Sequence, residues 1–405
     1  MDELRLPLRP EVAPETGSIS SRATLPLLAG YWAFGQYWGV WVILVFDLQR
    51  FHAITESRLG FLYAMLSVSA VLVMLLVAPL LQPLPLSFSV PISLVSLGVG
   101  SFAIGYLPTS GIVVGFLLVG LGNGLIDVYL NVAAQRVEVA TRRPVLQWLH
   151  ASYALGGITG ATAAGLLRMA GLDFRLGLLF ATVALFLTAM WNLRTAPREH
   201  GPKGKATSFS ISALGRTPAL WVPAICVLFA FLVEGSMDTW SGLYLRNQLG
   251  ASAGMTAVVF VAFSSAIFLG RLFAGRVLYG LGPRTTILIA GVGSAVGGTA
   301  AVTTDSAVVV GAAFLLLGFM ISAAAPAGFS LTEDIDEDPA HAIAAVTTVG
   351  YTGFVWSPPL LGYIAQTFDL RAAMSVTVVA TAGIIVAGLL APRGRPDRRD
   401  TPRSR

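Results

Sequence analysis

The chain has 405 residues, of which 55% are hydrophobic and only 12% are charged, and its mean hydropathy is +0.75. Soluble domains carry about 25% charged residues, so this composition excludes a soluble protein and indicates a membrane protein with several spanning segments. The net charge of +5 is spread over short loops, which gives no support for a nucleic-acid partner.

Apolar runs separated by charged or Pro/Gly breaks predict twelve transmembrane helices, because about 20 apolar residues cross a ~30 Å hydrocarbon core. In the first half they cover residues 24–48, 58–81, 87–106, 111–134, 149–171 and 176–194. In the second half they cover residues 218–245, 255–279, 285–303, 306–329, 342–367 and 372–391. The third and ninth are the weakest, since glycine and polar residues dilute them. The predicted fold is an all-α polytopic membrane protein.

A polar stretch divides these helices into two six-helix bundles. The predicted order is an N-terminal tail (1–23), a first bundle (24–194), a central loop (195–217), a second bundle (218–391) and a basic tail (392–405). A weak internal repeat relates the second helices of the two halves. Duplicated halves with a site between them are typical of secondary transporters.

Basic residues orient the predicted helices. If both termini are cytoplasmic, 20 of the 26 lysines and arginines lie on the cytoplasmic side. The positive-inside rule therefore predicts that both termini are cytoplasmic. The expected location is a cell membrane, which in a bacterial cell is the inner (plasma) membrane. The N-terminal tail lacks the features of a cleaved signal peptide, so we expect the first span to act as the insertion signal.

The segment GLGNGLIDVYLN places an acid inside a predicted span. Asn123, Asp127 and Asn131 are four residues apart and therefore lie on one helix face. An aspartate at the centre of a span costs ~2.5–3.5 kcal/mol on insertion scales, so Asp127 should face a cavity or a partner. Two interpretations stay open. Asp127 forms an interhelical hydrogen-bond clamp, with His150 or Tyr153 as partner, or it takes part in binding or proton coupling.

The seventh predicted helix carries a second acidic pair, Glu234 and Asp238, spaced one turn apart. Glu234 is expected near mid-membrane, opposite Asp127, whereas Asp238 is either a substrate ligand or solvated near the outer interface. An acid whose surroundings alternate between buried and open can bind a proton on one side and release it on the other. Asp127 and Glu234 are therefore the predicted proton-coupling residues.

Aromatic and amide side chains supply further predicted substrate contacts. Flat rings beside amides and carboxylates suit the apolar face and hydroxyl rim of a sugar, and equally an organic cation. The predicted substrate-binding residues are Gln36, Tyr37, Trp41, Asn123, Asn131, Asp238 and Tyr351. The dipeptide Pro358-Pro359 is expected to bend the eleventh helix, as a rocking hinge or a packing kink.

The stretch GRLFAGRVLYGLGPRTTI (270–287) resembles the loop signature of the major facilitator superfamily. The resemblance implies a loop that helps to lock the cytoplasmic gate. The corresponding first-half stretch, APLLQPLPLS, carries no charge. The predicted gating residues are Arg271, Arg276, Glu138 and His150.

With twelve spans and two related halves, this motif identifies the chain as a member of that superfamily. The blocks GLGNGLIDVYLNVAAQRVE and VLQWLHASYALGGITGA resemble its fucose permease branch, with further matches at 46–60, 234–246 and 343–365. The resemblance covers most of both halves and implies that Asp127 acts in proton coupling and sugar recognition. The sequence departs from that branch because no arginine precedes Asp47, an acid expected to be solvated.

The sequence thus predicts a proton-coupled secondary transporter that moves a small neutral polar, sugar-like solute by alternating access. No lysine or arginine is expected in the middle of a span, so an anionic substrate would lack a counter-charge. The alternative is a proton-driven antiporter that exports a hydrophobic or cationic metabolite or drug. The fifth helix lacks the Gly-Pro of the drug antiporter signature.

Features of an enzyme are missing from the sequence. It has no Walker loop, metal-ligand cluster or nucleophile–base arrangement, so we expect neither an enzyme nor a bound metal or cofactor. The single cysteine, Cys226, lies in an apolar span and can form no intrachain disulfide. The expected partners are a small-molecule substrate, protons and the lipid bilayer, and the expected state is a monomer.

Overall fold

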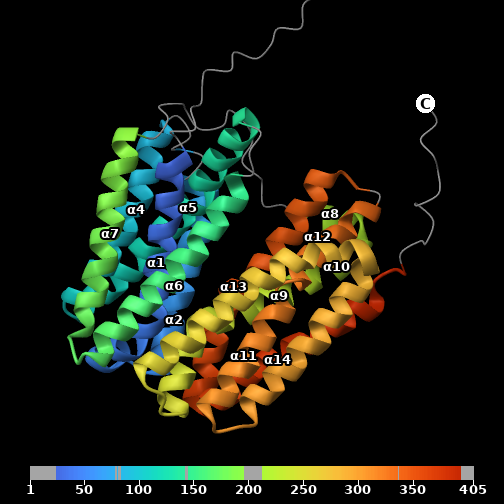
Figure 1. Cartoon of the computed structure of the whole chain (residues 1–405). Helices are drawn as coiled ribbons and strands as arrows, with labels where there is room; N and C mark the ends of the chain where they lie inside the picture. Colours follow the sequence, from blue (N-terminus) through green and yellow to red (C-terminus); the bar gives the residue numbers. More distant parts are fainter. Residues whose placement is uncertain are drawn as a thin grey trace, which may run out of the picture.

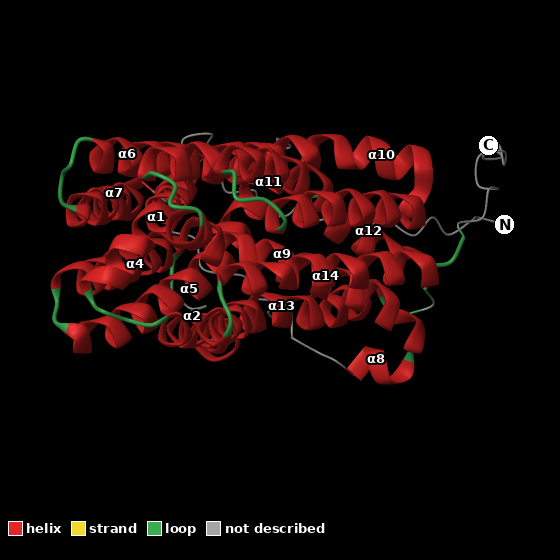
Figure 2. Cartoon of the chain, turned by 90° about the horizontal axis from the view of Figure 1, so that it is seen from below, coloured by secondary structure: helices red, strands yellow, loops and turns green. Residues whose placement is uncertain are grey.

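The computed structural model describes residues 24–77, 80, 84–141, 145–195, 212–335 and 337–393. Within these ranges the chain is helical with short connections and has no strand (Figure 2). The predicted N-terminal tail, most of the central loop and most of the basic tail lie outside the described residues.

The first half forms six long helices. They are α1 (Thr24–Phe51), α2 (Glu56–Leu72) with its π-helical extension η2 (Val73–Val77), α4 (Leu86–Tyr106), α5 (Thr109–Thr141), α6 (Val145–Met169) and α7 (Phe174–Thr195). α2 begins at a side-chain cap, because the Thr55 hydroxyl accepts a hydrogen bond from the Arg58 N–H.

The second half begins with short pieces and continues with long helices. They are α8 (Ser212–Arg216), η3 (Pro218–Leu220), α9 (Trp221–Leu243) with η4 (Tyr244–Gln248), α10 (Ala253–Val302), α11 (Ala307–Ile321), α12 (Ala324–Ser330), η5 (Leu331–Asp334), α13 (Pro339–Thr367) and α14 (Leu370–Leu390). α10 consists of two helices, because Gly282 has φ 77° and ψ 167°, a conformation that glycine adopts readily, and Pro283 follows it. The described ranges therefore contain twelve long helical segments, which confirms the predicted all-α architecture.

Eight of these helices are long and apolar enough to cross a membrane by length and composition alone, with α10 counted once. The helices outside that set are α1, α6 and α13. By this measure the weakest spans are α1, α6 and α13 rather than the predicted third, which has the lowest hydropathy of the eight, 1.7; the ninth is counted within α10 and has no separate value. α1, α6 and α13 each contribute to the contact between the two halves, where polar and small residues replace lipid-facing aliphatic ones.

The helices gather into two groups, one from each half of the chain, which converge at one end (Figure 1). We call this the closed end, and the opposite end, where α1 begins and α14 finishes, the terminal end. At the closed end α2 crosses α13 with backbone against backbone. A Cβ atom on Gly60 would lie 2.8 Å from the Pro358 carbonyl oxygen and 3.0 Å from the Gly362 Cα. α13 stays helical through its two prolines, and the Pro358 carbonyl lies at this crossing.

Further contacts join the halves at the closed end. A Cβ atom on Gly242 of α9 would lie 2.3 Å from the Val42 carbonyl oxygen of α1. The Asn247 amide donates a hydrogen bond to Gln49 Oε1 over 3.2 Å. The Arg246 guanidinium lies 4.2 Å above the Phe46 ring. Apolar, polar and cation–π contacts therefore hold this end of the interface together.

Candidate functional site

The polar stripe predicted on the fourth span lies on α5. Asn123, Asp127 and Asn131 are all half-buried, and the Asn131 amide donates to the Asp127 backbone oxygen over 2.7 Å. A Cβ atom on Gly120 or Gly124 would lie 2.4 Å from a carbonyl oxygen of α2. The glycines of the segment therefore let the backbone of α2 approach closely.

The Asp127 carboxylate faces the region between the halves. It lies within electrostatic reach of the hydroxyls of Tyr31 on α1, Tyr153 on α6 and Tyr351 on α13, the last from the second half. No described residue donates a hydrogen bond to the carboxylate, so the clamp to His150 or Tyr153 is not formed in this structure. Asp127 is therefore an acid without a fixed partner, reached from both halves.

On the second half, a predicted proton-coupling residue and a predicted gating residue form an ion pair. The Arg271 Nη2 atom lies 3.1 Å from Glu234 Oε2 and 3.4 Å from Glu234 Oε1. The Glu234 side chain is buried, whereas that of Arg271 is half exposed. The expectation that no cation lies inside a span was wrong, because the long Arg271 side chain reaches from α10 to the middle of α9.

Asp238 lies one turn from Glu234, toward the closed end. Its carboxylate is exposed, yet it lies within electrostatic reach of Glu234 and Arg271 in its own half and of Tyr63 and Tyr153 in the first half. No described residue donates a hydrogen bond to it. An exposed side chain surrounded by groups from both halves lines an open cleft between them, and Asp238 lies at its closed end.

Aromatic rings from both halves flank these acids. In the first half the Tyr31 ring lies 5.7 Å from the His150 ring and 6.4 Å from the Tyr153 ring. In the second half the Tyr351 ring lies 5.8 Å from Phe231. Offset and edge-on rings of this kind form stable walls for a small solute.

Three predicted substrate residues on α1 lie elsewhere. Gln36, Tyr37 and Trp41 are completely buried in the first half, with 0–1% of their surface exposed. The Trp41 indole donates to the Tyr63 hydroxyl over 2.7 Å, so it packs behind a residue of the cleft. In this state these three side chains do not line the cleft, and their contact with substrate stays a prediction.

The face of α1 that turns toward the second half carries different residues. Val42 and Gln49 contact the second half. Tyr31 lies eleven residues before Val42, and Trp38 lies eleven residues before Gln49, a spacing that returns to the same face of a helix. Trp38 is half-buried and was missed by the sequence analysis. The i, i+7, i+11 spacing that begins at Tyr31 is the signal that could have found it.

The predicted gating residues are only partly brought together. His150 is exposed on α6 and lies within electrostatic reach of Arg271 across the interface. Glu138 is half-buried on α5, and Arg276 is exposed on α10. Among the described residues Arg276 forms no ion pair, so a joint lock of all four residues is not present in this state.

An ion pair near the closed end was not expected from the sequence. The Asp47 carboxylate accepts hydrogen bonds from Arg168 Nη2 over 2.8 Å and from Arg168 Nε over 3.2 Å. The side chains are 10% and 24% exposed, so Asp47 is paired rather than solvated. The cation that pairs with Asp47 comes from α6.

This pair supports the first of our predictions. Replacing Arg168 with methionine is expected to destabilise the protein by about 1–3 kcal/mol, because Asp47 keeps a largely buried charge without its donors. The thermal unfolding of the detergent-solubilised variant measures the loss. Asp47→Asn combined with Arg168→Met should recover part of it, and an unchanged melting temperature in Arg168→Met would contradict the prediction.

Two carboxylates outside the spanning helices have basic and hydroxyl partners. Hydrogen bonds from Arg175 lower the pKa of Asp173, in the loop before α7, to about 2. A hydrogen bond from Thr217, with Arg216 nearby, holds the pKa of Glu337 below its usual range. Over the described ranges, no three His, Cys, Asp or Glu residues gather as a metal site.

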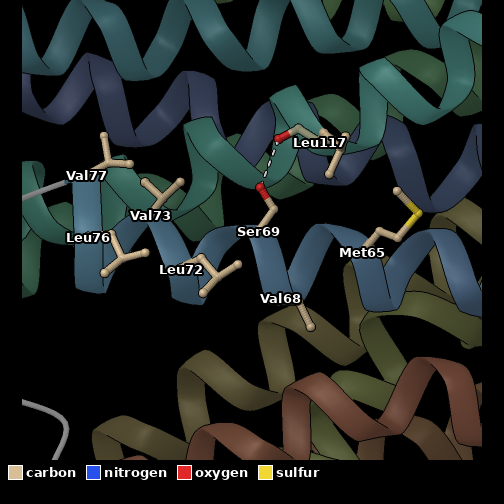
Figure 3. Close-up of a pocket in the computed structure, with 8 residues that line it drawn as sticks. All are labelled: Met65, Val68, Ser69, Leu72, Val73, Leu76, Val77 and Leu117. Carbon is tan, nitrogen blue, oxygen red and sulfur yellow. Dashed lines mark hydrogen bonds between the residues drawn. The ribbon is translucent and has the colours of Figure 1, made fainter.

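A separate groove on α2 and η2 has no chemistry suited to a polar solute. It encloses about 310 Å³ and is lined by apolar side chains apart from Ser69. The Ser69 hydroxyl already donates a hydrogen bond to the Leu117 carbonyl oxygen over 3.2 Å (Figure 3). The acids and aromatic rings of the cleft remain the candidate site.

Two six-helix groups joined at one end, with acids and aromatic rings between them, define a membrane transporter rather than an enzyme. The family model of the Major Facilitator Superfamily matches residues 26–353 and 242–405, so the chain belongs to this superfamily.

One relative is similar in sequence, and two solved structures are similar in fold. An uncharacterized MFS-type transporter of Yersinia pestis is 31% identical over 276 residues, which are 66% of this chain and 71% of that protein. The crystal structure of a bacterial homolog of the human lysosomal transporter Spinster has a TM-score of 0.75 at 14% identity, over 92% of this chain and 98% of that chain. The D-xylose-proton symporter has a TM-score of 0.71 at 14% identity, over 91% and 96%. The likeness to the fucose permease branch stays an interpretation of the motifs.

Proposed function

We propose that this protein is a proton-coupled secondary transporter of a small polar solute, with Asp127 as the group that carries the proton. The observation that carries the proposal is the position of the Asp127 carboxylate, which has no hydrogen-bond donor among the described residues and is reached from both halves. A charged carboxylate without a partner is unfavourable in a dry interior and acceptable in water. When the two ends of the protein open in turn, the Asp127 carboxylate therefore binds a proton on one side of the membrane and releases it on the other.

The orientation follows from the basic loops. With both termini in the cytoplasm of a bacterial cell, the closed end faces outward and the cleft opens inward. Transport then requires the α2–α13 crossing at Gly60 and Gly362 to part while the terminal end closes. In this cycle Asp127 meets the cytoplasm in the state described here and the outer solution in the other.

Both the resemblance to sugar carriers and the amides of α5 favour a solute with several hydroxyl groups. Asn123 and Asn131 are half-buried beside Asp127, and each amide offers both donors and acceptors. A protein of the same fold is named as a D-xylose-proton symporter, which supports proton symport as the starting hypothesis. Antiport of a cationic solute is the second candidate, favoured by the unpaired Asp238.

Proteoliposomes test the proposal. Solutes that raise the melting temperature of the purified protein, from a panel of sugars, polyols, amines and drugs, would be added outside vesicles that contain a pH-sensitive dye. Symport predicts that the lumen acidifies when the solute is added, and that an inward proton gradient drives accumulation which a protonophore abolishes. Solute movement with no proton movement would contradict proton coupling, and lumen alkalinisation would identify antiport.

A further inference from the structure

The charges of the cleft do not balance. The cleft holds three carboxylates, those of Asp127, Glu234 and Asp238, and the one guanidinium described beside them, that of Arg271, is bound to Glu234 at 3.1 Å. Two negative charges therefore have no counter-ion among the described residues of the cleft. A buried carboxylate needs a proton or a cation, and Glu234 has the guanidinium of Arg271, whereas the exposed Asp238 carboxylate lies in the cleft with no cation bound to it. If Asp127 takes the proton, as in the proposed function, Asp238 still lacks a partner.

Asp238 lies where a solute would touch both halves. The next residue, Thr239, accepts a hydrogen bond at its backbone oxygen from the Tyr63 hydroxyl of α2, over 3.5 Å. One turn further along α9, Gly242 packs against the Val42 backbone of α1. A group bound to the Asp238 carboxylate thus lies directly beside the contacts that part when the closed end opens.

Two hydrogen-bonding groups near Tyr63, on the first-half side of this end, are also unused. The Tyr37 hydroxyl and the Trp240 indole nitrogen are completely buried and have no hydrogen-bond partner. The Tyr37 hydroxyl lies within electrostatic reach of that of Tyr63, and the Trp240 ring lies 6.5 Å from the Tyr63 ring. Buried polar groups are rarely left unpaired, so these two mark the packing around Tyr63, behind the wall of the cleft, as a place that gains polar partners when this end opens.

We propose that the solute carries a protonated amine, which binds the Asp238 carboxylate, on a small polar body. The ring of Tyr153, which lies within electrostatic reach of both Asp127 and Asp238, offers a face to the same cation. A neutral solute would leave Asp238 unpaired. An anionic solute would meet two unbalanced negative charges while Arg271 is held by Glu234. This inference rests on the proposed function, in that it takes the cleft to be the transport site.

Matched pairs of solutes test the inference on the full-length protein in lipid nanodiscs. Glucose is compared with glucosamine, and sorbitol with glucamine, by calorimetric titration at pH 7. The aminated member of at least one pair is expected to bind about tenfold or more tightly than its neutral counterpart, because a charge-assisted hydrogen bond is added. Equal affinity within both pairs, or no binding by either amine, would overturn the inference.

Variants assign the preference to its residue. Asp238→Asn is expected to remove the amine preference while neutral solutes keep their affinity, and Asp238→Glu is expected to retain it. Asp173→Asn makes the same chemical change in a loop, where Asp173 pairs with Arg175, and should leave the preference unchanged. Thermal unfolding shows that each variant is folded. An amine preference that survives in Asp238→Asn would reject the assignment.

The outcomes separate this inference from the proposed function. Proton-driven uptake of neutral solutes with no amine preference would reject the amine site and keep the proton-coupled transporter. An amine preference that depends on Asp238, without any proton movement, would keep the amine site and reject proton coupling.

Discussion

Asp127→Asn is expected to abolish accumulation of the solute while exchange of solute across the membrane continues. The amide has nearly the same shape as the carboxyl group but cannot carry a proton. With one proton per solute, a gradient of one pH unit drives about tenfold accumulation, because 1.4 kcal/mol corresponds to a factor of ten. The variant should therefore only equilibrate the solute, and uptake into proteoliposomes with and without a proton gradient measures the ratio.

The matched control is Asp173→Asn, which should accumulate the solute as the wild type does. Counterflow of labelled solute, which needs no proton gradient, distinguishes lost coupling from lost binding. Accumulation at the wild-type level in Asp127→Asn would show that Asp127 does not carry the coupled proton. Failure of both accumulation and counterflow would instead indicate that Asp127 is needed for binding.

Gly60→Leu is expected to hold the closed end apart and to reduce transport at least about tenfold. A Cβ atom at Gly60 already lies 2.8 Å from the Pro358 carbonyl oxygen and 3.0 Å from the Gly362 Cα, and these are backbone atoms that cannot rotate away. The two helices must separate to admit a leucine side chain. The state described here should then become less populated. The state in which the α2–α13 crossing has parted should become more populated.

A cysteine reporter measures this change directly. Cys226 is the single cysteine of the chain and is buried, so Val42→Cys would introduce the reactive thiol at the closed end, where Val42 is 3% exposed. We expect slow maleimide labelling of Val42→Cys alone and fast labelling when Gly60→Leu is added. Gly275→Leu is the control, because nothing lies within 4 Å of a Cβ atom there. Equal labelling and transport in all variants would contradict the prediction.

The helices could be predicted because a bilayer accepts only segments whose backbone groups bond internally. Runs of about 20 apolar residues therefore translate into helices, and even the break inside α10 follows from Gly282 and Pro283. Asp127 could be singled out for a related reason, since an acid inside an apolar run is costly unless it has a task.

It was harder to predict which face of each helix turns toward the other half. α1 is apolar almost all round, so no periodic pattern marks the face that meets the second half. Gln36 and Trp41 looked suited to a solute but lie inside the first half, whereas Trp38 lies on the face shared with Tyr31 and Gln49.

Ion pairs between helices were equally hidden from the sequence. Arg168 is 121 residues from Asp47, and Arg271 is 37 residues from Glu234. Neither pair follows a helical spacing, because each depends on how separate helices pack and on how far an arginine side chain extends. The acids of the candidate site could be singled out from the sequence, but not their partners.

The glycine crossing between α2 and α13 also bears on the energy balance of the transport cycle. Backbone surfaces that meet at Gly60 and Gly362 can slide and part without unlocking large interdigitated side chains. Such a contact keeps the two conformations close in free energy, and each 1.4 kcal/mol of difference changes their population ratio tenfold. A weakly bound solute, by preferring one conformation by only a few kcal/mol, is then sufficient to reverse which of them predominates.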